Sequence, residues 1–534
     1  MATAQARCEL KANYYSLIPI AKYAHCNTIA AARRYSKLCT ARVWPHLLWV
    51  TRGSTQRTRM NQKPLYQKIA SHYQEAIESG ALKPGQRLPS LREMTRAHGI
   101  SLSTAVQACR ALEETGWLEA RARSGNFVRN TAHAGHHQTH ELGLGTERTD
   151  QLDELLSIDA ILAAARHSKV DVDLSAASCA PHLYPASELR KLAVAVMRGA
   201  PDILASSAHP LGNLAFRQAV AHRMLKRGVQ VSPQSVIVNH GASEGLALAL
   251  RAVARPGDAV LLESPTYYGI RQLLETFGVR SVELPTSAQC GLVVEAVEFA
   301  LRETSRVVAV VNMPTLHNPT GSTMPNEARE RLVSLCESHN IALIEDDVYA
   351  DLHPNVLKLR PQKYWDRNGI VIYCSSFNKT LSPGFRLGWM LGGRWHATIE
   401  ALSMVQSRPK EELQQRVVAR FLESGSYDRH IQHVRENIWR QRQTVAALVK
   451  DAFPDGTYVH DTRAGLSMWV KLPASVSSRR LFRRALENRI RVLPGAIFSS
   501  STYFDSYIRL GCGWPLDDER RRAISKVGQL CQDC

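Results

Sequence analysis

One lysine in a polar loop constrains the fold of this chain more than any other feature. The stretch 373–389 reads YCSSFNKTLSPGFRLGW and follows a run of mostly β-forming residues at 369–373. This order predicts a strand that ends in a polar loop. Open α/β sheets bind ligands where strands end in this way. The amine of Lys379 can condense there with an aldehyde, once burial or a nearby cation lowers its pKa.

Two neighbours of the lysine indicate that the same loop holds an anion. Ser376 precedes Lys379 and Arg386 follows it. The planar guanidinium of arginine matches the geometry of a phosphate. A solvated loop lysine remains the alternative interpretation of this stretch taken alone, so the rest of the chain has to decide.

Further polar residues stand at the ends of two other predicted strands. The apolar run 341–345 delivers Asp346 at its end, and Tyr349 follows three residues later. Asn318 lies in a turn after the predicted strand 307–312. An acid here suits a protonated ring nitrogen, and the tyrosine suits a ring oxygen.

A helix start and an aromatic residue complete the set. Small residues at 241–245 open a helical pattern at 246–253, so the N–H groups of Ala242 and Ser243 are expected to face an anion. Tyr267 follows the predicted strand 259–263, where its ring can stack on a planar cofactor. Singly, each feature also fits a cap, a turn or a core aromatic.

Together, in this order and at these intervals, the five motifs resemble the fold-type I pyridoxal-phosphate enzymes of the aspartate aminotransferase superfamily. The resemblance covers about residues 170–530. It implies an α/β fold with a mostly parallel sheet in a large domain, a small α+β domain, and pyridoxal 5'-phosphate as the cofactor.

The resemblance also implies a role for each site residue. Lys379 is the catalytic Schiff-base lysine, and Asp346 pairs with the ring nitrogen of the cofactor. The other implied contacts are Tyr349 and Asn318 to the ring hydroxyl, Tyr267 on the ring face, Ala242, Ser243, Ser376 and Arg386 around the phosphate, and Arg509 to a substrate carboxylate. Ser207 departs from the family, because most relatives carry a tyrosine there that reaches the neighbouring subunit's phosphate.

Composition sets broad limits on the rest. The chain has 534 residues, 44% of them hydrophobic and 22% charged, as in soluble globular domains, and it is long enough for three units. No apolar run approaches the length of a membrane span, so we expect no membrane partner. Cys531 and Cys534 form the one close pair among 11 cysteines, and no second pair completes a zinc site. We therefore expect no metal, and reduced thiols in a cytoplasm.

Residues 1–59 contain ten basic residues and one acid, Glu9. An organelle presequence is one interpretation of such a segment. The favoured prediction is that Met60 is the true start, because a recognisable domain begins just after it. Either way we expect residues 1–60 to be a disordered extension.

The segment 61–130 reads as three helices and a hairpin. Apolar residues recur at helical spacing over 66–77, Ser90 is placed to cap a second helix, and Gly99 turns the chain before a third helix at 103–115. Two short strands at 117–119 and 126–128 follow. This order predicts a winged helix-turn-helix, and its net charge of +4 suits DNA phosphates.

This segment resembles the GntR family of bacterial repressors, through residues 80–92 and 124–128. The resemblance implies DNA contacts by Arg92, Ser101, Ser103, Thr104 and Gly125. Leu102 stands where the family often has arginine, and Val106 where some relatives have it. Phosphate positioning is therefore better supported than base readout.

A polar tract at 131–150 separates this unit from the rest and contains His133, His136, His137 and His140. Metal binding is one interpretation, but a flexible linker is favoured because no regular structure would fix the geometry. We expect the large domain over 151–395 and the small domain over 396–534.

The fusion of both parts resembles the MocR subfamily of GntR-type regulators. It implies a bacterial cytoplasmic, nucleoid-associated homodimer, head-to-tail, that binds operator DNA and senses an amine or amino acid through aldimine exchange. Two alternatives stay open. The first is an aminotransferase acting on an amino acid, and whether a regulator would keep residual transamination is also left open. The second is a non-catalytic aminotransferase-like part that serves only dimerisation. The last predicts loss of the cofactor residues, which are present.

Overall fold

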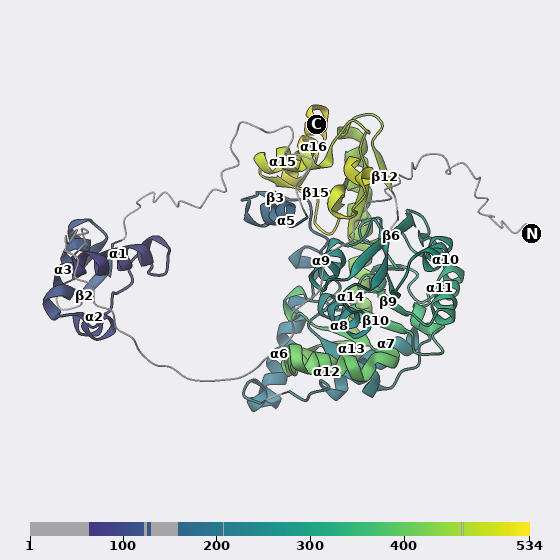
Figure 1. Cartoon of the computed structure of the whole chain (residues 1–534), viewed down its shortest axis with the longest axis horizontal. Coiled ribbons are helices and arrows are strands. Elements are labelled where there is room, and N and C mark those ends of the chain that lie inside the picture. The colour runs from purple at the N-terminus through teal and green to yellow at the C-terminus, as the bar shows by residue number, and fades with distance from the viewer. Residues whose placement is uncertain (1–63, 122–124, 130–157, 207, 461, 463) are drawn as a thin grey trace, which may run out of the picture. The chain divides into compact units, whose positions relative to one another are not determined.

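A computed structural model describes residues 64–121, 125–129, 158–206, 208–460, 462 and 464–534. Contacts divide the chain into two compact units, Met1–Gly143 and Leu144–Cys534 (Figure 1). The predictions for residues 1–60, for the histidine-rich tract and for Ser207 lie outside the described residues. Within those described ranges, no helix combines the length and apolar character that a membrane crossing requires.

The first unit is the predicted winged helix-turn-helix. Its elements are α1 (Leu65–Glu78), α2 (Leu91–His98), α3 (Leu102–Glu114) and the antiparallel strands β1 (Leu118–Arg121) and β2 (Gly125–Val128). Ser90 and Glu93 form a reciprocal capping box at the start of α2, as the serine suggested. Ser101 caps α3, so this helix begins at Leu102, one residue before the predicted start.

The second unit is built on an eight-stranded, mostly parallel sheet. The strand order is β4-β11-β10-β9-β8-β5-β6-β7, and the pairs β10–β11, β11–β4 and β6–β7 are antiparallel. The strands are β4 (Val236–Asn239), β5 (Ala259–Ser264), β6 (Arg280–Ser287), β7 (Gly291–Leu292), β8 (Val307–Asn312), β9 (Ala342–Asp346), β10 (Val371–Ser376) and β11 (Gly388–Leu391).

Helices cover both faces of this sheet because its strands alternate apolar residues between the faces. Ala342 and Ile344 of β9 pack with α8, α9 and α12, whereas Leu343 packs with α10 and α11 on the other face. A third cluster joins α6, α7 and α13 to β4 and β11. These helices are α6 (Ala186–Gly199), α7 (Leu214–Lys226), α8 (Ala242–Val253), α9 (Tyr268–Thr276), α10 (Val294–Glu303), α11 (Asn326–Ser338), α12 (His396–Gln406) and α13 (Glu412–Glu423).

A smaller antiparallel sheet follows, in the order β12-β13-β16-β15. It packs with the long helix α14 and with α15 and α16 around an apolar cluster that includes Val449, Val470 and Val527. The elements are α14 (Ser426–Ala452), β12 (Tyr458–His460), β13 (Ser467–Lys471), α15 (Ser478–Glu487), β15 (Leu493–Pro494), β16 (Tyr507–Gly511) and α16 (Asp518–Leu530). The helix α5 (Ile158–His167) and strand β3 (Val172–Asp173) belong to the same unit.

Two predicted boundaries beside the loop of Lys379 and the start of α8 were wrong for local reasons. The strand β10 continues to Ser376, because this residue pairs with Gly388 of β11. The helix α8 begins at Ala242, four residues before the apolar pattern starts, because small residues form its first turn. Two short strands follow each other closely near the end of the chain: β14 (Ile490–Arg491) pairs with β3, and β15 pairs with β16.

Candidate active site

A cavity of about 780 Å³ in the second unit brings together every residue predicted to bind the cofactor or the substrate. The contributors come from strand ends, from the start of α8 and from β16. They are Lys379, Asp346, Tyr349, Asn318, Ala242, Ser243, Tyr267, Ser376, Arg386 and Arg509. Residues separated by up to 267 positions in the chain therefore share one wall.

Lys379 lies in the loop after β10 with its amine inside the cavity wall. Its Nζ donates to the carbonyl of Ala177 at 2.8 Å and lies 6.0 Å from the ring centre of Tyr349. Burial, followed by the positive charge of Arg509, lowers the pKa of Lys379 to about 8. A substantial share of free amine therefore exists near neutral pH.

Asp346 is the last residue of β9 and is only 3% exposed. The N–H of Val348 donates to its Oδ1 at 3.2 Å. Burial raises the pKa of this carboxyl to about 7, the nearby acids Asp347 and Glu263 add to the effect, and the Val348 N–H opposes it. A cationic partner in the cavity would restore the ionised form.

Arg509 projects from the middle of β16 and is held on two sides. Its Nη1 donates to Oδ1 of Asn318 at 2.8 Å, and its Nη2 donates to the carbonyl of Ser175 at 2.7 Å. The Nε group is buried and has no acceptor in the described part of the chain. A guanidinium fixed in this way is preorganised for an anion in the cavity.

The start of α8 forms a cradle with the loop after β10. Gly241, the N-cap residue, has φ +100° and gives the helix no side-chain cap. A Cβ at this position would stand 2.5 Å from Nδ2 of Asn378 and 3.8 Å from Nη2 of Arg386, so glycine permits the close approach. The first N–H groups of α8, Ser376 and the Arg386 guanidinium thus surround a place suited to an anion.

The predicted DNA contacts lie on the surface of the first unit. Arg92 on α2 is exposed. The Ser101 hydroxyl is 2.8 Å from the hydroxyls of both Ser103 and Thr104, so the three form one polar cluster at the start of α3. Leu102 is 56% exposed between them, where the family often has arginine.

Gly125 opens β2 with φ +103°, and the Arg87 side chain lies beside it. A Cβ there would come within 3.0 Å of Arg87 Nε. Glycine therefore permits the Arg87 guanidinium to lie next to the start of β2. The sequence motifs did not single out Arg87.

Comparison with known proteins matches both parts of the chain. The family model "Aminotransferase class I and II" matches residues 183–527, and the model "Bacterial regulatory proteins, gntR family" matches residues 65–128. The HTH-type transcriptional regulators YdcR and YjiR of Escherichia coli (strain K12) are each 32% identical over 468 residues. These alignments cover 88% and 87% of this chain, and 99% and 98% of the relatives.

The chain belongs to the MocR-type transcription regulators. Among solved structures, the multiple substrate aminotransferase of Thermococcus profundus has a TM-score of 0.65 at 24% identity, over 71% of this chain and 95% of that one. This likeness confirms the fold-type I architecture. The protein is thus a DNA-binding transcription regulator that also carries an aminotransferase-like domain.

The cavity of this MocR-type regulator fits pyridoxal 5'-phosphate, the cofactor of its aminotransferase part. A buried carboxyl suits a ring N–H, the uncapped helix start suits a phosphate, and a lysine amine suits an aldehyde. Asn378 also lines this cavity, beside the start of α8. The polar groups left open are those that such a cofactor would complement.

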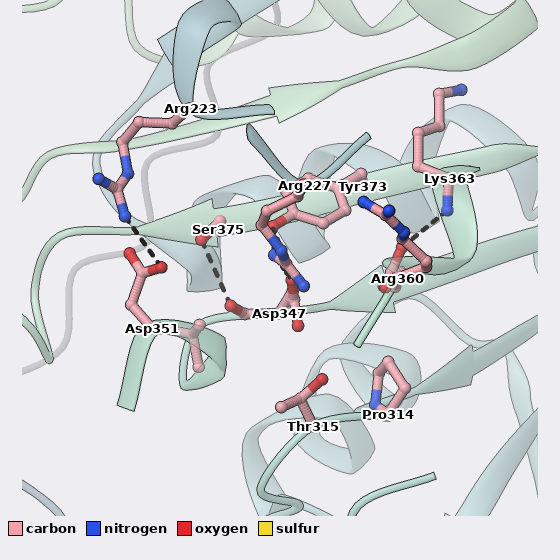
Figure 2. A network of polar contacts seen from close by, with 12 residues as sticks. Arg223, Arg227, Pro314, Thr315, Asp347, Asp351, Arg360, Lys363, Tyr373 and Ser375 are labelled. Carbon is pink, nitrogen blue, oxygen red and sulfur yellow. Dashed lines mark hydrogen bonds and ion pairs between the residues drawn. The ribbon is translucent and has the colours of Figure 1, made fainter. Parts of the chain in front are cut away.

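A buried network behind the site escaped the sequence analysis (Figure 2). Arg227 is ion-paired with Asp347 and donates to the Tyr373 hydroxyl at 3.0 Å, and that hydroxyl donates to Asp347 at 2.7 Å. Asp347 directly follows Asp346, so the network anchors the end of β9. The signal was the run of acids at 345–347 after an apolar strand, but its arginine partner lies at the end of α7 and is distant in sequence.

Arg329 of α11 was missed for the same reason. It is fully buried and donates to the carbonyls of Met324 and Pro314, each at 2.8 Å, and to the Thr315 hydroxyl at 2.9 Å. These bonds close the loop that carries Asn318. Other cavity residues that the motifs did not reveal are Arg166, residues 175–178, Tyr268, Gln272, Asn378 and Arg491.

The buried carboxyl of Asp346 predicts a stability gain from its removal. Because its pKa is raised to about 7 from 3.8, its ionisation opposes folding as pH rises from about 4 to about 7. In the cofactor-free protein, Asp346→Asn should therefore raise the free energy of unfolding at pH 8, by at most on the order of 4 kcal/mol. Chemical denaturation at pH 5 and pH 8 measures this. A gain that is no larger at pH 8 than at pH 5 would contradict the assignment.

The lowered pKa of Lys379 predicts how fast the cofactor aldehyde attaches. The free amine is the reactive form, so the attachment rate should rise as pH increases through about 8 and then level off. Stopped-flow absorbance of cofactor-free protein mixed with pyridoxal phosphate measures the rate. Arg509→Gln removes a nearby positive charge and should move the midpoint to higher pH. An unmoved midpoint would remove Arg509 from the electrostatics of the lysine.

Proposed function

We propose that the cavity of this regulator senses an amine or amino acid and that its occupancy controls operator binding. The supporting observation is that Lys379, with its lowered pKa, and Arg509 line one cavity in a chain that also carries a winged helix-turn-helix. One group reacts with an aldehyde and the other suits a carboxylate. An amino acid presents an amine and a carboxylate at a short, fixed separation.

Pyridoxal phosphate supplies an aldehyde on which one primary amine can replace another. In this proposal Lys379 holds that aldehyde and Asp346 accepts the N–H of the ring. The remaining roles are the phosphate cradle of Ala242, Ser243, Ser376 and Arg386, the hydroxyl partners Tyr349 and Asn318, the stacking ring of Tyr267, and Arg509 for the ligand carboxylate. Each of these residues lines the cavity.

The displaced lysine gives the ligand-bound state a different charge distribution. When a ligand amine takes its place, Nζ is free beside the Ala177 carbonyl, 2.8 Å away, and can hold a proton there. The ligand carboxylate at the same time compensates Arg509. A conformation of the aminotransferase-like domain can interact more favourably with the ligand-bound state of the cavity than with the ligand-free state. Ligand binding then shifts the conformational equilibrium by the difference between these two interaction free energies.

The first unit supports operator DNA as the partner. Arg92 and the hydroxyl cluster of Ser101, Ser103 and Thr104 are placed to contact phosphates, with Gly125 at the wing. We further propose a head-to-tail homodimer, because two paired half-sites of DNA require two winged helix-turn-helix units. We place this dimer in a bacterial cytoplasm, associated with the nucleoid.

An aminotransferase acting on an amino acid is the second candidate. The specific observation in its favour is that the lysine, its acid and its carboxylate arginine are all retained in one cavity. For this reaction Lys379 Nζ would move a proton at the ligand's α-carbon. Regulation is preferred, because a plain aminotransferase has no use for a winged helix.

Visible absorbance of the purified holoprotein, titrated with a panel of amino acids and other amines without keto acid, separates the candidates. Sensing predicts a saturable shift that persists and an effect of the same amine on DNA binding. Conversion to the pyridoxamine form would favour the enzyme. Lys379→Ala should lose the lysine-bound cofactor band while its circular dichroism stays native. An unchanged band in that variant would refute the role of Lys379.

Arg92 provides a test of the DNA face. Arg92→Ala should weaken binding to a fragment selected from random DNA by the wild-type protein, and should reduce the salt slope by about one, as for one lost phosphate contact. Fluorescence anisotropy at several salt concentrations measures both. Lys68→Ala, an exposed lysine on α1, is the matched control and should leave the slope unchanged. Equal slopes for wild type and Arg92→Ala would exclude Arg92 from the interface.

A further inference from the structure

The cavity extends past the cofactor residues to the helix α5. Leu162, Ala165 and Arg166 of this helix line it, at the spacing that puts three side chains on one helical face. Gln272 of α9 also lines the cavity, and its Nε2 donates to Oδ1 of Asp159 on α5 at 2.5 Å. These contacts fix the position of α5 against the cavity.

The charges on the cavity wall are unequal. Five cationic side chains line it against one acid, Asp346. In the proposed function Lys379 and Arg386 serve the cofactor, and Arg509 serves the ligand carboxylate. Two arginines remain without an assigned partner in the ligand or the cofactor, Arg166 and Arg491.

Two of the three guanidinium nitrogens of Arg491, on β14, have partners. Its Nη1 is ion-paired with Asp173 at 3.1 Å, and its Nη2 donates to the carbonyl of Ser168, just past the end of α5, at 3.3 Å. Its Nε is buried and has no acceptor in the described ranges. The Arg491 side chain as a whole is 20% exposed and lines the cavity, so an anion there can approach this guanidinium.

Arg166 contributes the uncompensated charge. It lies in the last turn of α5 and is exposed, and within the described residues no carboxylate forms an ion pair with it. Asp173 already balances Arg491, so the positive charge that remains at this end of the cavity is that of Arg166.

The same end of the cavity is tied to Arg509 by a continuous set of bonds. Oδ1 of Asp173, whose other oxygen holds Arg491, accepts from the backbone N–H of Ser175 at 2.8 Å. The carbonyl of Ser175 in turn accepts from Arg509. Arg509, for the first carboxylate, and Arg491, for a second anion, are thus held in one framework before any ligand binds, which lowers the entropic cost of binding.

We propose that Arg166 and Arg491 form a second anion-binding position, and that the effector is an amino acid with an acidic side chain. This inference rests on the proposed sensing function and narrows its ligand class. The side-chain carboxylate pairs with the guanidinium groups of Arg166 and Arg491. A neutral amide of the same shape can accept one hydrogen bond through its oxygen, but it gains no charge pair and cannot accept through both of its polar atoms.

Paired ligands of equal shape test the inference: L-glutamate against L-glutamine, and L-aspartate against L-asparagine, titrated into the holoprotein and followed by absorbance. The acidic member of at least one pair should bind on the order of tenfold or more tighter, the size expected for one charge-assisted contact. Arg166→Ala should remove most of this preference, because it weakens binding of the acidic member far more than binding of the amide. Arg166→Lys should restore part of it.

His167→Ala is the matched control, because His167 is the exposed neighbour on α5 and is not part of the cavity lining. It should keep the preference. Neutral amino acids that bind as tightly as acidic ones would overturn this inference and leave the sensing function standing, and so would a preference that Arg166→Ala does not change. If no amino acid and no other amine of the panel alters the spectrum, the sensing function itself fails and this inference fails with it.

Discussion

The parallel pairing of β9 with β10 is the constraint on which the site depends. Cys374 lies opposite Asp346 in this pair, so both strands end at the same edge of the sheet. The chain that leaves β10 then carries Ser376 and Lys379 past the carboxyl of Asp346. On the far side of β10, Gly388 of β11 pairs with Asn239, the last residue of β4, which brings the start of α8 to the same edge. One register thus supplies the acid, the amine and the anion cradle.

Two consecutive acids at that edge have opposite surroundings, and the difference separates structure from chemistry. Asp347 is enclosed by Arg227 and Tyr373, which satisfy one of its oxygens and fix the end of the strand (Figure 2). Asp346 accepts one backbone N–H and otherwise faces the cavity. Neighbouring carboxyls that differ in this way can take different roles, because the environment and not the residue type sets their charge.

Sequence patterns revealed those site residues that follow their own strand or open their own helix. Asp346, Lys379 and Ala242 were found because each stands at a strand end or a helix start, where short-range periodicity is informative. Arg227, Arg329 and Arg491 were missed because their importance lies in partners brought by the tertiary fold. The partners of Arg227 and Arg491 lie 120 to 323 residues away in the chain, and those of Arg329 lie 5 to 31 residues away. The carbonyls of Ala177 and Ser175 escaped too, since every residue carries a carbonyl and no pattern singles one out. The roles assigned to the motif residues stay predictions that the shared cavity supports.

In the proposed function, the contacts of α5 are the place where a ligand in the cavity would act on the rest of the chain. From Arg509 the bonds run through Ser175 and Asp173 to Arg491, which holds the carbonyl just after α5. In chain order α5 is the first described element after the DNA-binding unit. A ligand that bridges Arg509 and the end of α5 favours the arrangement in which both are in place, and differential affinity of that kind is all that a switch requires. Linkage makes the effect reciprocal: if the ligand alters affinity for the operator by some factor, the operator must alter affinity for the ligand by the same factor. The coupling can therefore be measured either as the effect of the operator on ligand affinity or as the effect of the ligand on operator affinity.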